Sequence, residues 1–304
     1  MTKILVTGGA GFIGSNLVDM LLEHGYEVSV LDNLSSGKIS NIPKKVEFIK
    51  GNICEPETVK SSLKDVEIIF HLAAQASVAV SMTNPLLDTE YNVKGTVNIL
   101  ETAYQTEIDQ FIFASTGGAI YGSPKLSPPN ESSSEEPISI YGTSKLVAEK
   151  YISLYQRRGL KSSILRFANV YGPRQDPHGE AGVISIFMNK IKSGKPIHVF
   201  GDGSSSRDYV FVKDVAKVAM EMIKKPYPNP INVGSGQETI LNDLISVIKL
   251  IVGKDFDIIY TDKRKGDVDN IYLDCTKLKN HLGWLPSTPL ETGLAEVWDW
   301  ISAN

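Results

Sequence analysis

A glycine-rich turn near the amino terminus constrains the fold of this chain more than any other feature. The turn Gly8-Gly9-Ala10-Gly11-Phe12-Ile13-Gly14 follows the apolar run Ile4–Val6 and precedes a segment, residues 12–22, whose apolar residues recur at helical spacing. A second strand pattern begins at Glu27 and ends at Asp32. Strand, tight turn, helix and strand in this order form a βαβ unit, so the sequence predicts a parallel sheet with its first turn free for a ligand.

Later segments extend this pattern through the first half of the chain. Four more strands are expected at Val46–Ile49, Ile68–Phe70, Gln110–Ala114 and Ser163–Arg166, and two of the crossover helices at residues 86–104 and 141–157. We therefore expect an α/β fold: a doubly wound parallel Rossmann-type sheet over residues 1–166 and a smaller, substrate-binding C-terminal lobe over residues 167–304. Two amphipathic helices of the second half, Leu241–Val252 and Leu290–Ile301, are expected to pack beside the first lobe.

Composition excludes several classes of function. The 304 residues carry 31 Lys and Arg against 35 Asp and Glu, a net charge of −4 without a long basic run, which argues against nucleic-acid or membrane partners. No run of about 18 apolar residues exists to span a bilayer. Cys54 and Cys275 are too few for a disulfide framework, and the five histidines lack ligand spacing, so no metal site is expected. These features predict a cytoplasmic protein with a small-molecule partner.

The spacing around the glycine turn indicates which ligand the first lobe binds. Gly8, Gly11 and Gly14 allow a tight turn, close approach of the backbone to a pyrophosphate, and contact between helix and sheet. Asp32 follows about 20 residues later, where a carboxylate accepts from the ribose hydroxyls of adenosine. A 2′-phosphate there would be repelled, and no arginine adjoins Asp32 to receive it. The predicted cofactor is therefore NAD rather than NADP.

A tyrosine and a lysine one helical turn apart suggest the chemistry. In Tyr141-Gly-Thr-Ser-Lys145 both side chains can face one site. A tyrosine ordinarily titrates near about 10, so a neighbouring ammonium is needed to make the phenol a base near neutral pH. Together with a dinucleotide site, this pair predicts transfer of a hydride to or from the cofactor.

An ordered series of motifs joins these features. Thr7-Gly8-x2-Gly11-x2-Gly14, Asp32, His71-Leu72-Ala73-Ala74, Asn92, Ser115-Thr116 and Tyr141-x3-Lys145 are followed by Arg166-Phe167-Ala168-Asn169-Val170-Tyr171-Gly172-Pro173, Arg207-Asp208-Tyr209-Val210 and Arg264-Lys265-Gly266-Asp267. The series resembles that of the extended short-chain dehydrogenase/reductases over nearly the full length, and within them the UDP-glucose 4-epimerases most. The resemblance implies inversion of carbon 4 of a UDP-hexose through a captive 4-keto intermediate, with one tightly held NAD taking up the hydride and returning it.

The resemblance also implies residue roles. Tyr141 would be the base for the sugar 4-hydroxyl and Lys145 would hold the nicotinamide ribose. The cofactor site would comprise Gly8, Gly11, Phe12, Ile13, Gly14, Asp32, Asn33, Asn52, Ile53, Leu72, Ala73, Ala74, Gln75, Asn92, Tyr141 and Lys145. The UDP-sugar would be bound by Asn169, Val183, His198, Phe200, Arg207, Arg264 and Asp267. Relatives commonly form homodimers through two helices of the first lobe, which correspond here to residues 86–104 and 141–157.

One departure from the family pattern concerns the catalytic hydroxyl. Counted back from Tyr121, the place of the usual Ser or Thr is Gly117, with Gly118 beside it. We expect Thr116 to supply the hydroxyl, with Ser115 as the alternative; two glycines permit the backbone to turn and present it.

Several alternatives stay open. A nucleotide-sugar 4,6-dehydratase would need an Asp-Glu pair after the active-site threonine, where this chain has Gly117-Gly118. Decarboxylases and reductases of the superfamily, and N-acetylhexosamine or uronate substrates, are not excluded. A non-catalytic NAD-sensing protein is a reading of another class, although such proteins typically lose the tyrosine and lysine.

Overall fold

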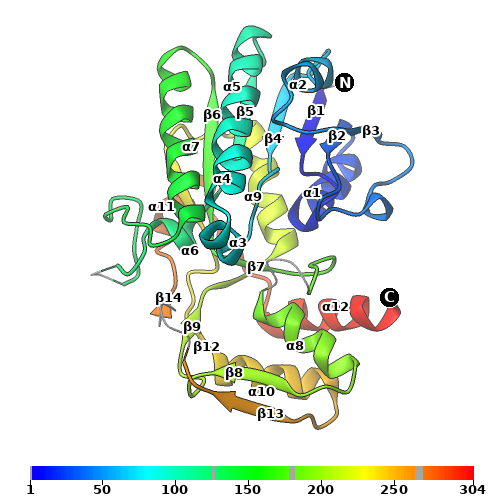
Figure 1. Cartoon of the computed structure of the whole chain (residues 1–304), viewed down its shortest axis with the longest axis vertical. Helices are drawn as coiled ribbons and strands as arrows, with labels where there is room; N and C mark the ends of the chain where they lie inside the picture. Colours follow the sequence, from blue (N-terminus) through cyan, green and yellow to red (C-terminus); the bar gives the residue numbers. More distant parts are fainter. Residues whose placement is uncertain (1, 125–126, 178–181, 264–269) are drawn as a thin grey trace.

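The protein has two lobes arranged around one large parallel sheet (Figure 1). The computed structural model describes residues 2–124, 127–177, 182–263 and 270–304. Strands β1, β2, β4, β5 and β6 run toward the second lobe, which lies below the sheet in the view of Figure 1 and contains α8, α10 and α12. The carboxyl ends of the strands therefore face the second lobe, and this is where open α/β sheets bind their ligands.

The bounds of the elements are as follows. The strands are β1 (Lys3–Thr7), β2 (Glu27–Asp32), β3 (Glu47–Lys50), β4 (Ile68–His71), β5 (Gln110–Thr116), β6 (Ser162–Phe167), β7 (Asn169–Tyr171), β8 (Ile197–Phe200), β9 (Ser206–Arg207), β10 (Tyr209–Phe211), β11 (Pro230–Val233), β12 (Thr239–Ile240), β13 (Ile258–Thr261) and β14 (Asn270–Ile271). The helices are α1 (Phe12–Glu23), α2 (Pro56–Ser62), α3 (Val78–Thr83), α4 (Pro85–Thr89), α5 (Thr96–Gln105), α6 (Gly117–Ile120), α7 (Ile140–Arg157), α8 (Val183–Lys192), α9 (Val212–Lys224), α10 (Leu241–Val252), α11 (Thr276–Leu282) and α12 (Leu290–Ala303), with a 3-10 turn η1 (Ile39–Asn41) and a π-helical turn η2 (Glu90–Gly95).

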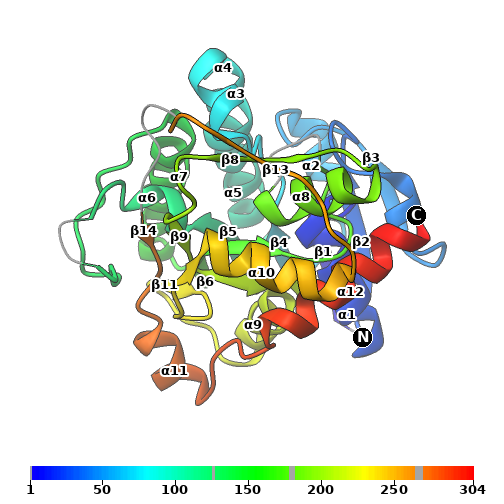
Figure 2. The same cartoon turned by 90° about the horizontal axis from the view of Figure 1, so that it is seen from below.

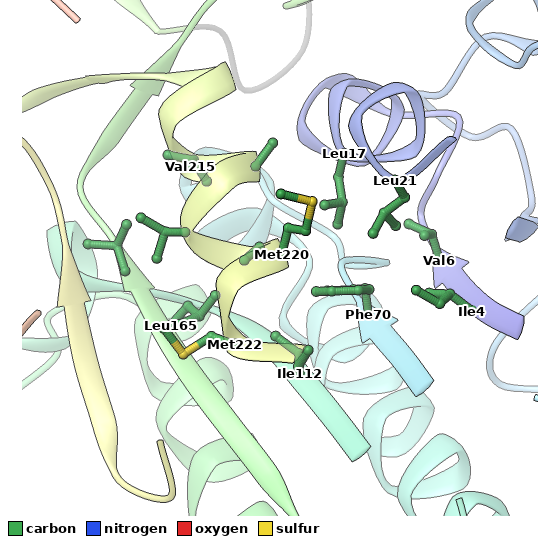
Figure 3. Packing of buried hydrophobic residues seen from close by; sticks show 14 of the residues in the cluster. Ile4, Val6, Leu17, Leu21, Phe70, Ile112, Leu165, Val215, Met220 and Met222 are labelled. Carbon is green, nitrogen blue, oxygen red and sulfur yellow. The ribbon is translucent and has the colours of Figure 1, made fainter. Parts of the chain in front are cut away.

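The main sheet has seven parallel strands in the order β11-β6-β5-β4-β1-β2-β3, so the predicted doubly wound fold is confirmed. Successive side chains of a strand point to opposite faces. On β1, Ile4 and Val6 accordingly join a core with α1 and α9, while Leu5 joins a core with α2, α5 and α7. Figure 3 shows the first of these cores, with Leu17 and Leu21 of α1 and Met220 of α9 above the sheet.

The second lobe has a core of its own. Apolar side chains of α8, α10 and α12 pack there against β8 and β10, and Figure 2, seen from the side of the second lobe, shows the three helices in front of the main sheet. Helices α10 and α12 were expected to pack beside the first lobe; they pack mainly in this second core, which Phe12 and Ile13 of α1 also contact. The core of the first lobe is completed by α9, whose apolar face packs on α1 and the sheet, and the sheet is extended by β11 beside β6.

Most predicted elements exist within a few residues of their expected ends. The helix expected over residues 86–104 is continuous but includes the π-helical turn η2, a feature that often marks a functional site. The boundary expected after Arg166 stays a prediction, since α9, β11 and α11 return to the first lobe from the later half of the chain.

Candidate active site

The glycine turn shapes the junction between β1 and α1. Gly8 has φ +71°, and a Cβ on it would lie 2.7 Å from the backbone nitrogen of Ala73. A Cβ on Gly14 would lie 2.2 Å from the carbonyl oxygen of Gly8, so both positions need glycine. Gly11 occupies the N-cap position of α1 and has no side chain that could accept a hydrogen bond. The N–H groups of the first turn, at Phe12 and Ile13, are therefore without a side-chain cap. An uncapped helix N-terminus attracts negative charge, so this turn fits a pyrophosphate.

Asp32 lies at the end of β2, beside the glycine turn. Its carboxylate accepts hydrogen bonds from the backbone N–H of Ala10 (3.0 Å) and Leu34 (2.8 Å). Each carboxylate oxygen has a second lone pair, so the group can still accept from ribose hydroxyls. Asn33 and Asn52 instead use their amide oxygens locally, on the N–H of Ser35 and Cys54.

The segment after β4, residues 72–75, is held in place from two sides. Asn92, in the π-helical turn, receives the N–H of Gln75 on its amide oxygen (2.9 Å) and donates to the carbonyl of Gln75 (2.8 Å). On the other side, the N–H of Ala73 donates to the Thr7 hydroxyl (3.3 Å). Leu72, Ala73, Ala74 and Gln75 therefore form a fixed rim between the glycine turn and η2. Ile53 lies in the core, so its side chain is not part of that rim.

His71 joins these two anchors through a buried chain of hydrogen bonds. Its Nδ1 lies 2.7 Å from the Thr7 hydroxyl and its Nε2 lies 3.0 Å from the Thr96 hydroxyl. The hydrogen of Thr96 goes to the carbonyl of Asn92, so Nε2 must donate and Nδ1 must accept. Burial, and secondly the charge of Lys145, lowers the pKa of His71 to about 3. The imidazole is a neutral structural link, and this chain of contacts could not be predicted from the sequence.

The predicted catalytic pair lies on α7. Ser139 caps the helix through the N–H of Gly142, and the N–H of Tyr141 donates to the Ser81 hydroxyl (3.1 Å). Lys145 is only 3% exposed, and its ammonium donates to the carbonyl of Ala114 (2.9 Å). Burial lowers the pKa of Lys145 to about 8, while Asp88 and then Glu149 act in the opposite direction. A buried lysine one turn after Tyr141 is suited to influence the ionisation of that phenol.

The two candidate hydroxyls at the end of β5 have different surroundings. Ser115 is buried, and its hydroxyl donates to Glu149 (2.5 Å). A Cβ on Gly118 would lie 4.0 Å from the Thr116 hydroxyl and 3.6 Å from the amide oxygen of Asn169, so both side chains, each predicted to belong to the site, lie beside Gly118.

Leu273 occupies the space beside Gly117. A Cβ at this position would lie 2.5 Å from the Leu273 side chain and 3.3 Å from the carbonyl oxygen of Arg166. The serine or threonine that the family pattern places at position 117 would therefore require the Leu273 side chain to shift, whereas a Cβ at Gly118 would make only ordinary contacts.

A buried ion pair holds α7 against β5 and β6. Arg166 is fully buried and donates to both oxygens of Glu149, from Nε at 3.0 Å and from a terminal nitrogen at 2.6 Å. It also pairs with Glu135 and donates to the Tyr121 hydroxyl (3.0 Å). Glu135 lies in the irregular segment between α6 and α7, and this segment supplies a carboxylate to the buried guanidinium.

The substrate-side residues come from short elements of the second half. Asn169 begins β7, Val183 begins α8, and Arg207 ends β9, where it donates to the carbonyl of Ser206 (2.8 Å). His198 and Phe200 lie on β8, and Phe200 is 37% exposed. Arg264 and Asp267 lie outside the described residues. Within the described ranges, no group of three or more His, Cys, Asp or Glu side chains could hold a metal ion.

The segment around Arg207 is fixed by its neighbour Asp208. This buried carboxylate accepts from the backbone N–H and hydroxyl of Ser235 (2.8 and 2.6 Å), and from the N–H groups of Gly236 and Leu273. Of the sequence motif Arg207-Asp208, only the arginine was predicted to be a site residue. The aspartate ties β9 to two other segments of the chain and so sets the place of Arg207.

Comparisons with known proteins agree with this geometry. The sequence model of the NAD dependent epimerase/dehydratase family matches residues 4–234. The chain is 48% identical to a "Putative UDP-glucose 4-epimerase" of Methanocaldococcus jannaschii, over 99% of both chains. Its structure is similar to that of a UDP-glucose 4-epimerase of Thermotoga maritima solved with UDP-glucose (45% identity, TM-score 0.97, 99% of both chains). It is also similar to a Thermus thermophilus UDP-glucose 4-epimerase in complex with NAD (40% identity, TM-score 0.93, 99% of both chains).

The comparisons confirm the resemblance inferred from the motifs and the choice of NAD as cofactor. Among the helices of the described part of the chain, none combines the length and apolarity needed to cross a membrane.

Proposed function

The chain belongs to the NAD dependent epimerase/dehydratase family, and from this premise we propose that it is a 4-epimerase that interconverts UDP-glucose and UDP-galactose. The observation that carries the proposal is the pairing of Tyr141 with a buried Lys145 on α7, beside a glycine turn that fits a dinucleotide. The names of the M. jannaschii and T. maritima relatives support the UDP-hexose as substrate.

The first lobe supplies the groups that would hold the cofactor. The uncapped first turn of α1 would bind the pyrophosphate, Asp32 the adenosine ribose, and Asn33 and Asn52 the region near adenine. Residues 72–75, fixed by Asn92, would border the nicotinamide side. When bound, NAD supplies an acceptor for the hydrogen of sugar carbon 4 and a donor that returns it to the opposite face.

The chain's own residues would manage the proton. Tyr141 would accept the proton of the 4-hydroxyl and later return it, which requires a phenol far more acidic than the ordinary value of about 10. The ammonium of Lys145, one helical turn away, would favour the phenolate. Thr116 would pass the proton between substrate and phenol, because Ser115 already donates to Glu149.

The second lobe would hold the nucleotide firmly and the hexose loosely. Arg207 and Arg264 would pair with diphosphate oxygens and Asn169 would donate to another, since guanidinium groups match phosphate geometry. Phe200 would lie against uracil, Val183 and His198 would line the base pocket, and Asp267 would bind the uridine ribose. Binding energy remote from carbon 4 would then support catalysis while the keto sugar turns over.

The rival readings make different demands on the site. A 4,6-dehydratase needs an acid and a base where Gly117 and Gly118 stand, so elimination of water lacks its catalysts. An NAD sensor has no use for Tyr141 and Lys145. An N-acetylated or carboxylated sugar would alter only groups away from carbon 4, so the assay panel includes those substrates.

Assembly and location are part of the proposal. Leu86 is 81% exposed on α4, and Tyr151 and Leu154 are 38% and 51% exposed on α7. Apolar side chains on these two helices support a homodimer in which four helices meet. We propose that the dimer works in the cytoplasm, which fits the scarcity of cysteine.

The decisive experiment incubates the purified holoenzyme with UDP-glucose, UDP-galactose, their N-acetyl forms and UDP-glucuronate, and separates the products. We expect interconversion of UDP-glucose and UDP-galactose. Tyr141→Phe should lower turnover by about a thousandfold while NAD stays bound. A 4-keto-6-deoxy product would favour the dehydratase, and a fully active Tyr141→Phe would refute the assigned base.

A further inference from the structure

Two buried carboxylates act electrostatically on Lys145, and neither was singled out by the sequence. Asp88 is on α4 and 0% exposed; Glu149 is one turn after Lys145 on α7 and 2% exposed. Both α4 and the π-helical turn η2 pack against α7, so the two acids approach the lysine from different elements. A buried ammonium needs a negative charge nearby, because desolvation disfavours its charged form.

The two carboxylates differ in what already neutralises them. Glu149 forms a two-pronged ion pair with Arg166, at 3.0 and 2.6 Å, and accepts the Ser115 hydroxyl. Its negative charge is therefore matched by a buried guanidinium. In the part of the chain that the structure describes, no lysine or arginine nitrogen, that of Lys145 included, lies within 4.0 Å of the Asp88 carboxylate. The charges of Asp88 and Lys145 therefore interact through space, across the contact between α4 and α7.

Asp88 is instead held by two neutral amides. One of its oxygens accepts from the side-chain amides of Gln75 and Asn92, both at 2.9 Å, and its other oxygen is buried without a hydrogen-bond partner among the described residues. Gln75 and Asn92 fix the carboxylate without cancelling its charge. An ionised buried carboxylate with a free oxygen is costly unless a cation lies close by, and Lys145 is the buried cation on the neighbouring helix.

We propose that Asp88 is the counter-ion of Lys145: a positioning residue that keeps the ammonium charged and so available to Tyr141. The proposal rests on the function proposed above and assigns a role to a residue outside the motifs. It also explains why the Asn92 segment is built around an acid, since the same carboxylate orders the rim at residues 72–75 and sets the charge of the lysine.

The other ionisable groups around Lys145 do not take this role. They are His71 of β4, Tyr141 and Glu149 of α7, and Arg166 of β6. His71 is neutral above about pH 3, and Arg166 is matched by Glu149. Of the two acids, Asp88 has the larger effect in raising the pKa of Lys145 against the opposing effect of burial.

The test compares two substitutions that remove one negative charge each. Asp88→Asn keeps the volume and the contacts to Gln75 and Asn92, whereas the matched control Glu149→Gln leaves Arg166 uncompensated. The titration of Lys145 is followed by NMR of 13C-lysine-labelled, NAD-bound protein, with the signal assigned by its absence in Lys145→Arg. We expect Asp88→Asn to lower the lysine midpoint by roughly one pH unit or more, and Asp88→Glu to leave it near the wild-type value.

Activity supplies a second readout. The alkaline limb of the turnover profile should move to lower pH in Asp88→Asn, because the lysine loses its proton earlier. Glu149→Gln should mainly lower the melting temperature and should shift the lysine less. Should Asp88→Asn fail to fold, Asp88→Ser is titrated in its place.

The outcomes separate this proposal from the proposed function. An unchanged lysine midpoint in folded Asp88→Asn or Asp88→Ser, or a larger shift in Glu149→Gln, would overturn the counter-ion role even in an active epimerase. Equal losses of activity in Asp88→Asn and Asp88→Glu with an unshifted profile would also overturn it. A shifted midpoint in a protein without epimerase activity would uphold the role of Asp88 and refute the function.

Discussion

On the cofactor side of the predicted site, buried side chains are joined by hydrogen bonds. On the substrate side, the predicted residues lie on short strands and are partly exposed to solvent. Thr7, His71 and Thr96 form one fully or almost fully buried hydrogen-bonded chain that fixes the rim after β4. Phe200, by contrast, ends a four-residue strand and is 37% exposed, and Arg207 ends a strand of two residues. Under the proposed function, such a site would pre-organise the half that holds NAD and leave the half that meets the sugar able to adapt.

This contrast predicts that substitutions on the cofactor side reduce the stability of the fold, and that substitutions on the substrate side reduce affinity. The largest effect is expected at the ion pair under α7. Arg166→Met leaves Glu149 buried without a partner, which should lower the free energy of unfolding by about 3–5 kcal/mol. Chemical denaturation measures this, with Lys150→Met as an exposed control from the same cluster. A loss below about 1 kcal/mol would contradict the assigned rigidity.

The next largest effect is a loss of folding stability at acidic pH. Because the pKa of His71 falls from 6.5 to about 3 on folding, the unfolded chain binds the extra proton between these values. Stability from this group is complete above pH 6.5 and is lost as the pH falls through that window, by about 2 kcal/mol at pH 5. Urea unfolding of wild type and His71→Asn at pH 7 and pH 5 checks this: the variant should lose less on acidification. Equal losses would show that other groups dominate acid sensitivity.

A smaller effect separates the two hydroxyls at the end of β5. Thr116→Val should lower turnover about tenfold or more with NAD still bound, because the proton loses its path to Tyr141. Ser115→Ala should chiefly lower stability, by about 1 kcal/mol, because it removes a hydrogen bond to Glu149. Turnover and thermal unfolding are measured for both. A larger loss of turnover in Ser115→Ala would transfer the catalytic role to Ser115.

The smallest effect is expected at the open end of the substrate side. Phe200→Ala should raise KM for the UDP-sugar about fivefold, close to 1 kcal/mol, with turnover little changed, because stacking on a base contributes to binding in ground and transition states alike. Tyr260→Ala is the matched control, since this exposed aromatic lies on the neighbouring strand β13. A fall in turnover without a change in KM would place Phe200 in the chemistry.

The extent to which sequence predicted the fold depended on how local the signals were. The α10 bounds, Leu241–Val252, match the expectation, and α7 begins one residue before it, because amphipathic spacing and a capping Ser139 are features of neighbouring residues. The elements against which these helices mainly pack are far away in the sequence and could not be predicted from it. Helix α9 and strand β11 were not predicted at all, and their return to the first sheet depends on surfaces that are far apart in the chain.

The same holds for the candidate site. Glycine spacing, Asp32 and the pair Tyr141 and Lys145 were visible in the sequence, because each follows from the position of a residue along one turn or one helix. The roles of Asp88 and Glu149 were not visible: a lone acid in a helix ordinarily lies in solvent. Their burial and their partners depend on how α4, α7 and β6 pack together.

The sequence by itself determined the βαβ beginning of the chain, its cofactor, and the phenol and ammonium that share one face of α7. Tertiary structure alone decided which charges surround that ammonium, that Leu273 lies where a side chain at position 117 would begin, and that the side chains of Thr116 and Asn169 both lie beside Gly118. The physical reason is range: backbone conformation and helical spacing act over a few residues, whereas burial and the pairing of charges depend on elements that meet only when the chain has folded.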